Sequence, residues 1–201
     1  VKVQLNTELT VEKILAEKPD VVVVATGAMA DLPDVPGLDA ALASGFARNI
    51  DRALGEGPET LPEGQIVVWG AAEGVELALD LARAGRKVRL LEPNVNFVPT
   101  SYIGSRTRYV MMWAAEAGLT PETGVLLDNV GDGTITVSHA DGRKEEIACA
   151  VLVLSPGRIA YDPISTRLAK AGIQVQVVGD ARKPRSYGNS IHEAAYLARN
   201  I

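Results

Sequence analysis

Apolar runs and amphipathic stretches alternate along this chain. A run that is apolar on both faces is typical of a strand inside a parallel sheet, because helices cover both faces of such a sheet. Stretches of helix formers that end at a glycine indicate helices. We therefore expect strands at residues 2–5, 21–27, 65–69, 87–92, 134–138, 145–148, 151–158 and 175–180, and helices at residues 10–17, 75–84, 106–117, 161–172 and 190–201. This alternation predicts the α/β class with parallel sheets.

The clearest single unit lies in the middle of the chain. A buried strand at residues 65–69 is followed by a tight turn at 70–74, and the helix at 75–84 ends at Gly85. The next strand follows at residues 87–92. A strand, a helix and a second strand at this spacing predict a βαβ unit, which is right-handed and pairs its two strands in parallel.

A hairpin and two irregular segments separate the regular elements. Asp141-Gly142, a favoured turn dipeptide, lies between two short strands and predicts an antiparallel hairpin. Two prolines and a glycine at residues 31–37 predict a loop. Residues 54–64 are rich in glycine, proline and acid, so we interpret them as a linker. The chain begins at Val1, within a predicted strand, which suggests a piece of a longer polypeptide.

Composition excludes several classes of function. The chain has 47% hydrophobic and 22% charged residues, a net charge of -5 and no basic run, so nucleic acid and an anionic membrane surface are not expected partners. No apolar stretch has the length of a membrane span and no signal peptide is evident, so we expect a cytoplasmic location. The single cysteine, Cys149, excludes an internal disulfide and a cysteine-based metal cluster. We assign no metal ligand.

The turn of the βαβ unit is where a dinucleotide would bind. The usual loop, G-x-G-x-x-G, has a glycine for the tight turn, one for approach of the pyrophosphate and one for helix packing. Aligned on residues 69–74, this chain keeps Gly74, has Gly70 between the first two positions, and has Trp69 and Ala71 in place of the first two glycines. Trp69 and Ala71 are expected to obstruct the loop. By contrast, Glu92 lies about twenty residues further on, where an acid binds the ribose 2′-hydroxyl of NAD.

Two further strand ends resemble each other. Gly27 follows the buried run at residues 21–26, and Gly157 follows the run at 151–154. Gly179 and Asp180 end a third strand, and an aspartate at such a position can accept a hydrogen bond from a ribose or ribityl hydroxyl. Together with the βαβ unit, these residues predict two dinucleotide-type subdomains.

The motifs in this order resemble the C-terminal region of the NADH:flavin oxidoreductase family, which is similar to old yellow enzyme and includes 2,4-dienoyl-CoA reductase and trimethylamine and histamine dehydrogenases. The resemblance covers nearly the whole chain. It is carried by VVVVATGA at 21–28, PDVPG at 33–37, IVVWG at 66–70, GVE at 74–76, VRLLE at 88–92, VGDARKPR at 178–185 and IHEA at 191–194.

The resemblance implies a Rossmann-like NAD-type domain at residues 65–158, inserted in an incomplete FAD-type α/β domain formed by residues 1–53 and 159–201. The glycine loop for FAD would precede Val1. In this family an N-terminal barrel of the same polypeptide carries FMN, in many members a 4Fe-4S cluster, and the catalytic acids. We therefore assign no catalytic residue to this chain. The incomplete domain leaves an unpaired strand edge, so we hypothesise self-association along it.

Three functions remain open at this point. In the first, NADH binds at residues 70–92 and its electrons pass through FAD to the flavin of the barrel. In the second, the domain is vestigial, keeps the dinucleotide fold, and binds ADP or has a structural role. Glu92 favours the first, and Trp69 with Ala71 favours the second. A stand-alone nucleotide-binding regulator is a third possibility, against which the start at Val1 argues.

Overall fold

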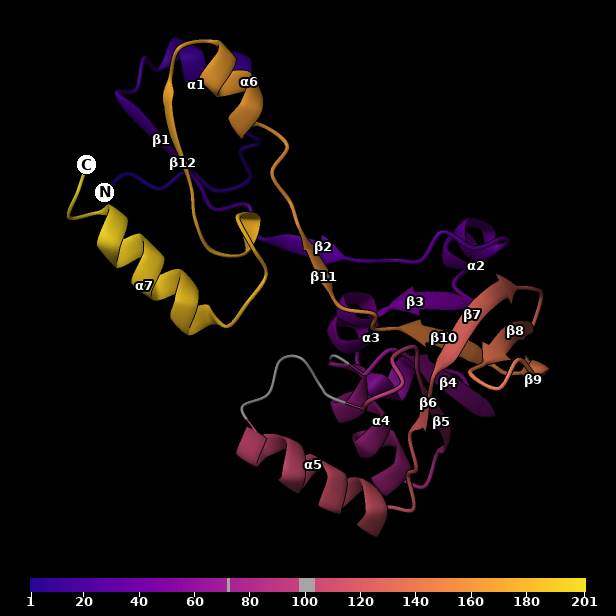
Figure 1. The fold of residues 1–201 in the computed structure, drawn as a ribbon. Helices are drawn as coiled ribbons and strands as arrows, with labels where there is room; N and C mark the ends of the chain where they lie inside the picture. Colours follow the sequence, from indigo (N-terminus) through magenta and orange to yellow (C-terminus); the bar gives the residue numbers. More distant parts are fainter. Residues whose placement is uncertain (72, 98–103) are drawn as a thin grey trace. The chain divides into compact units, whose positions relative to one another are not determined.

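The computed structural model describes residues 1–71, 73–97 and 104–201, and the chain divides into two compact units (Figure 1). The larger unit is Ala30–Gly157, and the smaller unit combines Val1–Met29 with Arg158–Ile201. The larger unit is thus inserted between two segments of the smaller one. A short two-stranded sheet of β2 (Ala28–Ala30) and β11 (Arg158–Ala160) lies where the chain passes between the units.

Five parallel strands form the central sheet of the larger unit, in the order β3-β10-β4-β5-β6. The βαβ strand β4 lies at the centre and is paired on both sides, which is why its sequence is apolar throughout. The α/β class with a Rossmann-like parallel sheet is confirmed. The strands are β3 (Ala47–Asn49), β10 (Val151–Leu154), β4 (Gln65–Trp69), β5 (Lys87–Glu92) and β6 (Glu122–Thr123).

Helices cover one face of this sheet. Successive side chains of a strand point to opposite faces, so Ile66 and Val68 of β4 belong to the core on the helix side. Helix α4 connects β4 to β5 and buries Val75 and Leu81 in the same core. The helical elements here are α3 (Ile50–Glu56), the 3-10 turn η1 (Pro58–Thr60), α4 (Gly74–Arg83) and α5 (Gly104–Glu116).

An antiparallel sheet covers the opposite face. The alternate residues Val67 and Trp69 of β4 belong to a second core cluster with Ile135 and Val137 of that sheet. Its order is β7-β8-β9, and β8 pairs with β9 as the hairpin that Asp141-Gly142 predicted. The elements of this layer are α2 (Leu38–Ser44), β7 (Val125–Val130), β8 (Thr134–His139) and β9 (Lys144–Ala148).

The smaller unit joins the two ends of the chain. Strands β1 and β12 pair in parallel, with Val24 beside Val177. A small core of Val11, Ile14 and Leu168 packs helices α1 and α6 against partly buried residues of both strands. The elements are α1 (Val11–Ala16), β1 (Val21–Val24), α6 (Ser165–Lys170), β12 (Gln174–Val177), the 3-10 turn η2 (Gly179–Ala181) and α7 (Tyr187–Leu197).

The structure places the boundary between the units earlier than the sequence predicted. Residues 30–53 were expected in the FAD-type domain, but they belong to the larger unit because β3 pairs with β10. Residues 54–64 are not a linker. They contain the end of α3 and η1, and Leu61 is buried in the core on the helix side. The second boundary, after Gly157, lies within one residue of the predicted one.

Three local predictions also differ from the structure. Residues 2–5 are not a strand, and Val3 and Leu5 are exposed. Strand β1 ends at Val24, and among the described residues it pairs only with β12, so it does not lie in the middle of a sheet. Helix α7 begins at Tyr187 and not at residue 190. None of the helices in the described part of the chain is long and apolar enough to cross a membrane.

Candidate functional site

Two glycines shape the turn between β4 and α4. Gly70 has a φ of +94°, and a Cβ added there would lie 2.2 Å from the carbonyl oxygen of Ser155. Only glycine fits both the left-handed backbone and this close approach. A Cβ at Gly74 would lie 2.8 Å from side-chain atoms of Ser155 and Val68, so Gly74 allows the first turn of α4 to pack closely on the strands. Gly70 therefore makes the tight turn, and Gly74 allows the close helix packing.

Trp69 lies outside the loop that it was expected to obstruct. Trp69 is the last residue of β4, is 6% exposed, and donates its Nε1–H to the carbonyl of Val125 at 3.0 Å. Its indole therefore packs between the two sheets and does not obstruct the loop. Ala71 follows in the loop, and Ala72 lies outside the described residues.

Glu92 lies at the carboxyl end of β5, where the sequence predicted it, but its partners are internal. The side chain is 5% exposed. Its Oε2 accepts a hydrogen bond from the Ala71 amide at 2.8 Å, and its Oε1 accepts one from the Asn94 amide at 2.9 Å and another from the Asn94 side chain. Both carboxylate oxygens thus accept hydrogen bonds from N–H groups, and one of these groups, the Ala71 amide, belongs to the loop.

Ser155 makes the corresponding contact from the other side of β4. Its hydroxyl accepts a hydrogen bond from the Gly74 amide at 2.8 Å, and the residue is 1% exposed. Gly157 follows two residues later with a φ of +116°, and its carbonyl accepts from the Asp31 amide at 3.0 Å. The amides of Ala71 and Gly74 therefore both have partners within the unit.

The predicted residues of the smaller unit form a separate group. Gly179 has a φ of +63°, and its amide donates to Oε2 of Glu193 at 2.9 Å. Asp180 accepts from the Arg185 amide at 3.1 Å, and the Arg185 guanidinium is paired with Glu193. The hydrogen bond from Arg185, followed by that from Gly179, holds the pKa of Glu193 below its usual value. Gly27, with a φ of +79°, accepts from the Tyr161 amide through its carbonyl.

The structure therefore brings together Gly70, Ala71, Gly74 and Glu92 at one sheet edge, and places Gly27, Gly179 and Asp180 in the other unit. The residues that sequence reasoning missed are Ser155, Asn94 and Glu193. Ser155 is 81 residues from its partner Gly74, and no local pattern reports such a contact. Glu193 is the acid of the IHEA segment, and it accepts a hydrogen bond from the Gly179 amide. An acid at that place in the motif could therefore have pointed to this contact.

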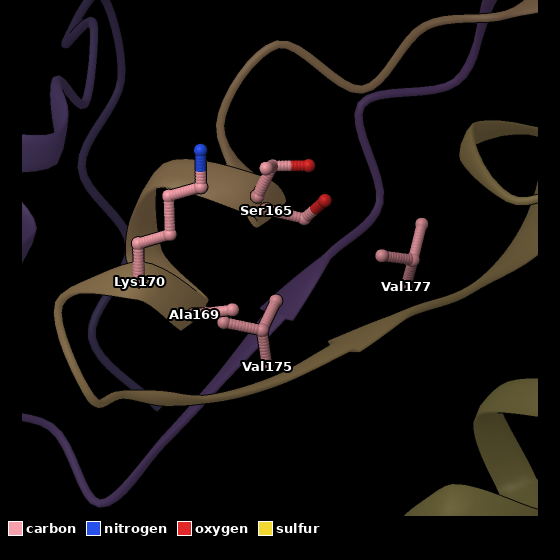
Figure 2. Close-up of a pocket in the computed structure, with 6 residues that line it drawn as sticks. Ser165, Ala169, Lys170, Val175 and Val177 are labelled. Atoms are coloured by element: carbon pink, nitrogen blue, oxygen red, sulfur yellow. The ribbon is translucent and has the colours of Figure 1, made fainter.

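A surface hollow of about 520 Å³ lies between α6 and β12 of the smaller unit. Figure 2 shows Ala169 and Val175 at its floor, with Ser165 and Lys170 on the helix side. None of the predicted site residues lines it. The hollow is thus separate from the dinucleotide-type loops.

Comparisons with known proteins place these loops in a family. Residues 2–185 match the family model described as pyridine nucleotide-disulphide oxidoreductase. The chain is 29% identical over 203 residues to bilirubin reductase of Mediterraneibacter gnavus, covering all of this chain and 30% of the relative. It is 32% identical over 189 residues to a nitric oxide reductase FlRd-NAD(+) reductase of Vibrio vulnificus, covering 87% of this chain and 48% of the relative.

Solved structures agree with this placement. A 2-naphthoyl-CoA reductase, solved in complex with 2-naphthoyl-CoA, matches with a TM-score of 0.78 and 26% identity, over 96% of this chain and 28% of that protein. Histamine dehydrogenase from Rhizobium sp. 4-9 has the same fold, with a TM-score of 0.74 and 20% identity over 98% of this chain and 31% of that protein. The chain thus spans less than half the length of each of these relatives. It belongs to the pyridine nucleotide-disulphide oxidoreductase family.

Proposed function

We propose that this chain is the dinucleotide-fold region of a longer flavin-dependent oxidoreductase of the NADH:flavin oxidoreductase type. The observation that carries the proposal is the insertion of one Rossmann-like unit between two segments whose strands β1 and β12 pair in parallel. In the NADH:flavin oxidoreductases that the sequence resembles, an NAD-type domain interrupts a FAD-type domain in this way. The larger unit then corresponds to the NAD-type domain and the smaller unit to part of the FAD-type domain.

The smaller unit has room for the rest of a FAD-type domain. The groove of about 750 Å³ beside β1 is lined by all four valines of that strand and by residues of α1 and the loop before it. Val23 is 45% exposed. We propose that a segment preceding Val1 in the longer polypeptide supplies both the neighbouring strand and the glycine loop for FAD. Without that segment, the unpaired edge favours the self-association hypothesised from the sequence.

The larger unit supports a nicotinamide site less well. NADH requires loop amides that face its pyrophosphate and an acid that faces its ribose. Here the Ala71 amide donates to Glu92 and the Gly74 amide donates to Ser155. The residues present therefore do not fit NADH in the usual way. This geometry favours the second function, in which the larger unit keeps the dinucleotide fold for a structural role.

Electron transfer in the complete protein would then depend on parts outside this chain. We propose that the N-terminal barrel of the same polypeptide binds FMN, and a 4Fe-4S cluster where its cysteines allow one, and carries the catalytic acids. In this proposal, the segment that completes the FAD-type domain lies between that barrel and this chain in sequence. A cytoplasmic location stays a prediction.

Cofactor analysis of the complete gene product tests this proposal. We expect the purified gene product to be yellow and to release flavin on denaturation, identified by chromatography and mass spectrometry. The 201-residue chain, purified in the same way, serves as the control and is expected to be colourless because it lacks the FAD glycine loop. A complete gene product without flavin would contradict the proposal.

A further inference from the structure

The carboxylate of Glu92 lies where the loop of a dinucleotide fold meets its ligand. Oε2 is 2.8 Å from the Ala71 nitrogen, and Oε1 is held by the backbone and side chain of Asn94. We infer that Glu92 acts as an internal anion that closes the loop in place of a bound phosphate. The inference concerns the larger unit alone and does not depend on the flavin content proposed above.

Burial and internal hydrogen bonds limit the access of a ligand to the Glu92 carboxylate. A carboxylate has about four acceptor positions, and three of those of Glu92 receive an N–H group from Ala71 or Asn94. Glu92 is only 5% exposed, so little of its carboxylate is open to a ribose hydroxyl while these bonds persist. The same side chain that would recognise the ribose of NAD is therefore committed to the loop.

Charge acts in the same direction as burial. The N-terminus of α4 begins at Gly74 and favours a negative charge nearby. Glu92 already supplies one negative charge beside this loop. A pyrophosphate entering the loop would meet that charge in a partly buried setting, where like charges repel more strongly than in water. A pyrophosphate can therefore bind at this loop only if it displaces Glu92.

The backbone around Asn94 holds Glu92 in place. The carbonyl of Asn94 accepts a hydrogen bond from the Gly124 amide at 3.0 Å, which ties the end of β5 to the segment between β6 and β7. Asn94 in turn donates to Glu92 through both its amide and its side chain. Rotation of Glu92 toward solvent would leave the Ala71 amide without a partner, which is costly because Ala71 is buried.

The inference is tested on the 201-residue chain by NMR titration with inorganic pyrophosphate and, separately, with ADP. The variants are Glu92→Gln, which removes the charge but keeps the shape, and Glu92→Ala, which also frees the Ala71 amide. Glu122→Gln is the matched control, because Glu122 is on the same sheet but is paired with Arg89. The Ala71 amide resonance reports binding at the loop itself, and the spectra show whether each variant is folded.

We expect pyrophosphate to leave the Ala71 resonance unchanged in the wild type and in Glu122→Gln. In Glu92→Ala or Glu92→Gln it should shift that resonance, with affinity at least about tenfold higher, because one like charge has been removed. Three results would overturn the inference. One is a pyrophosphate-induced Ala71 shift in the wild type, which is decisive even if no variant folds. The second is ADP binding by the wild type that Glu92→Gln weakens, and the third is a folded Glu92→Ala without any gain.

Discussion

The sequence predicts that Trp69 obstructs the loop, whereas the structure places its indole in the core. If the indole obstructed nucleotide entry, shortening it would improve NADH binding and leave the stability nearly unchanged. The structure instead places the indole between the two sheets, 6% exposed, with Nε1 donating to Val125. We therefore predict that Trp69→Ala strongly destabilises the larger unit and does not create NADH binding.

The expected loss can be worked out from the burial and the hydrogen bond. Replacing a buried Trp by Ala costs about 3–5 kcal/mol, which is a large part of the roughly 5–15 kcal/mol that stabilises a domain. Trp69→Phe keeps most of the ring but removes the donor to the Val125 carbonyl, so it should cost about 1–3 kcal/mol. Trp113 offers a matched control. It is 42% exposed and lies 5.4 Å from the Arg83 guanidinium, a contact worth about 0.5–1 kcal/mol.

Urea denaturation followed by far-UV circular dichroism measures these differences without relying on the tryptophans as probes. We expect the midpoint to fall in the order Trp113→Ala, Trp69→Phe, Trp69→Ala, with the last lowest, and calorimetric titration with NADH to show no gain in any variant. Equal midpoints for Trp69→Ala and Trp113→Ala would show that the indole of Trp69 is not part of the core. Tighter NADH binding by Trp69→Ala would restore the obstruction hypothesis.

Three further predictions follow from the larger unit. Gly70→Ala should lower the free energy of unfolding by roughly 2–5 kcal/mol, the sum of left-handed backbone strain and a clash with backbone atoms. Gly85→Ala, with a φ of +77° and open space around it, should lower it by only about 1–2 kcal/mol. Equal losses in urea denaturation would refute the close approach at Gly70. The Arg89 guanidinium lowers the pKa of Glu145 to about 2, whereas the pKa in the unfolded chain is about 4.3. The ionised carboxylate therefore stabilises the fold fully above about pH 4.3, and this contribution is lost as the pH falls through about 2. Arg89→Met should flatten the dependence of the free energy of unfolding on pH in this range, and an unchanged dependence would contradict the pairing. Burial raises the pKa of the Cys149 thiol to about 11, so an aromatic disulfide reagent at pH 8 should label it only after unfolding, and rapid labelling of the native protein would show that the thiol is accessible.

Local signals in the sequence were enough to predict several elements. The βαβ unit at residues 65–92, its glycine stop at Gly85 and the hairpin at Asp141-Gly142 all follow from period, turn chemistry and capping over a few neighbouring residues. The α/β class followed from their alternation. The positions of Gly74 and Glu92 at the ends of their elements were also readable, because they depend only on where a helix begins and a strand ends.

The contacts of those residues depend on how the strands pair. Residues 30–53 belong to the larger unit because β3 pairs with β10, about a hundred residues away in sequence, and the propensity of β3 itself does not indicate that partner. The role of Trp69 depended on which face of β4 it occupies, and neighbouring residues of a strand lie on opposite faces. Glu92 and Ser155 became partners of the loop amides only when β5 and β10 came to lie on either side of β4. Local patterns predict helices, strands and turns because these depend on residues that are close in sequence. The hydrogen bonds of Glu92 and Ser155 to the loop amides join residues that are far apart in sequence, and only the pairing of the strands brings them together.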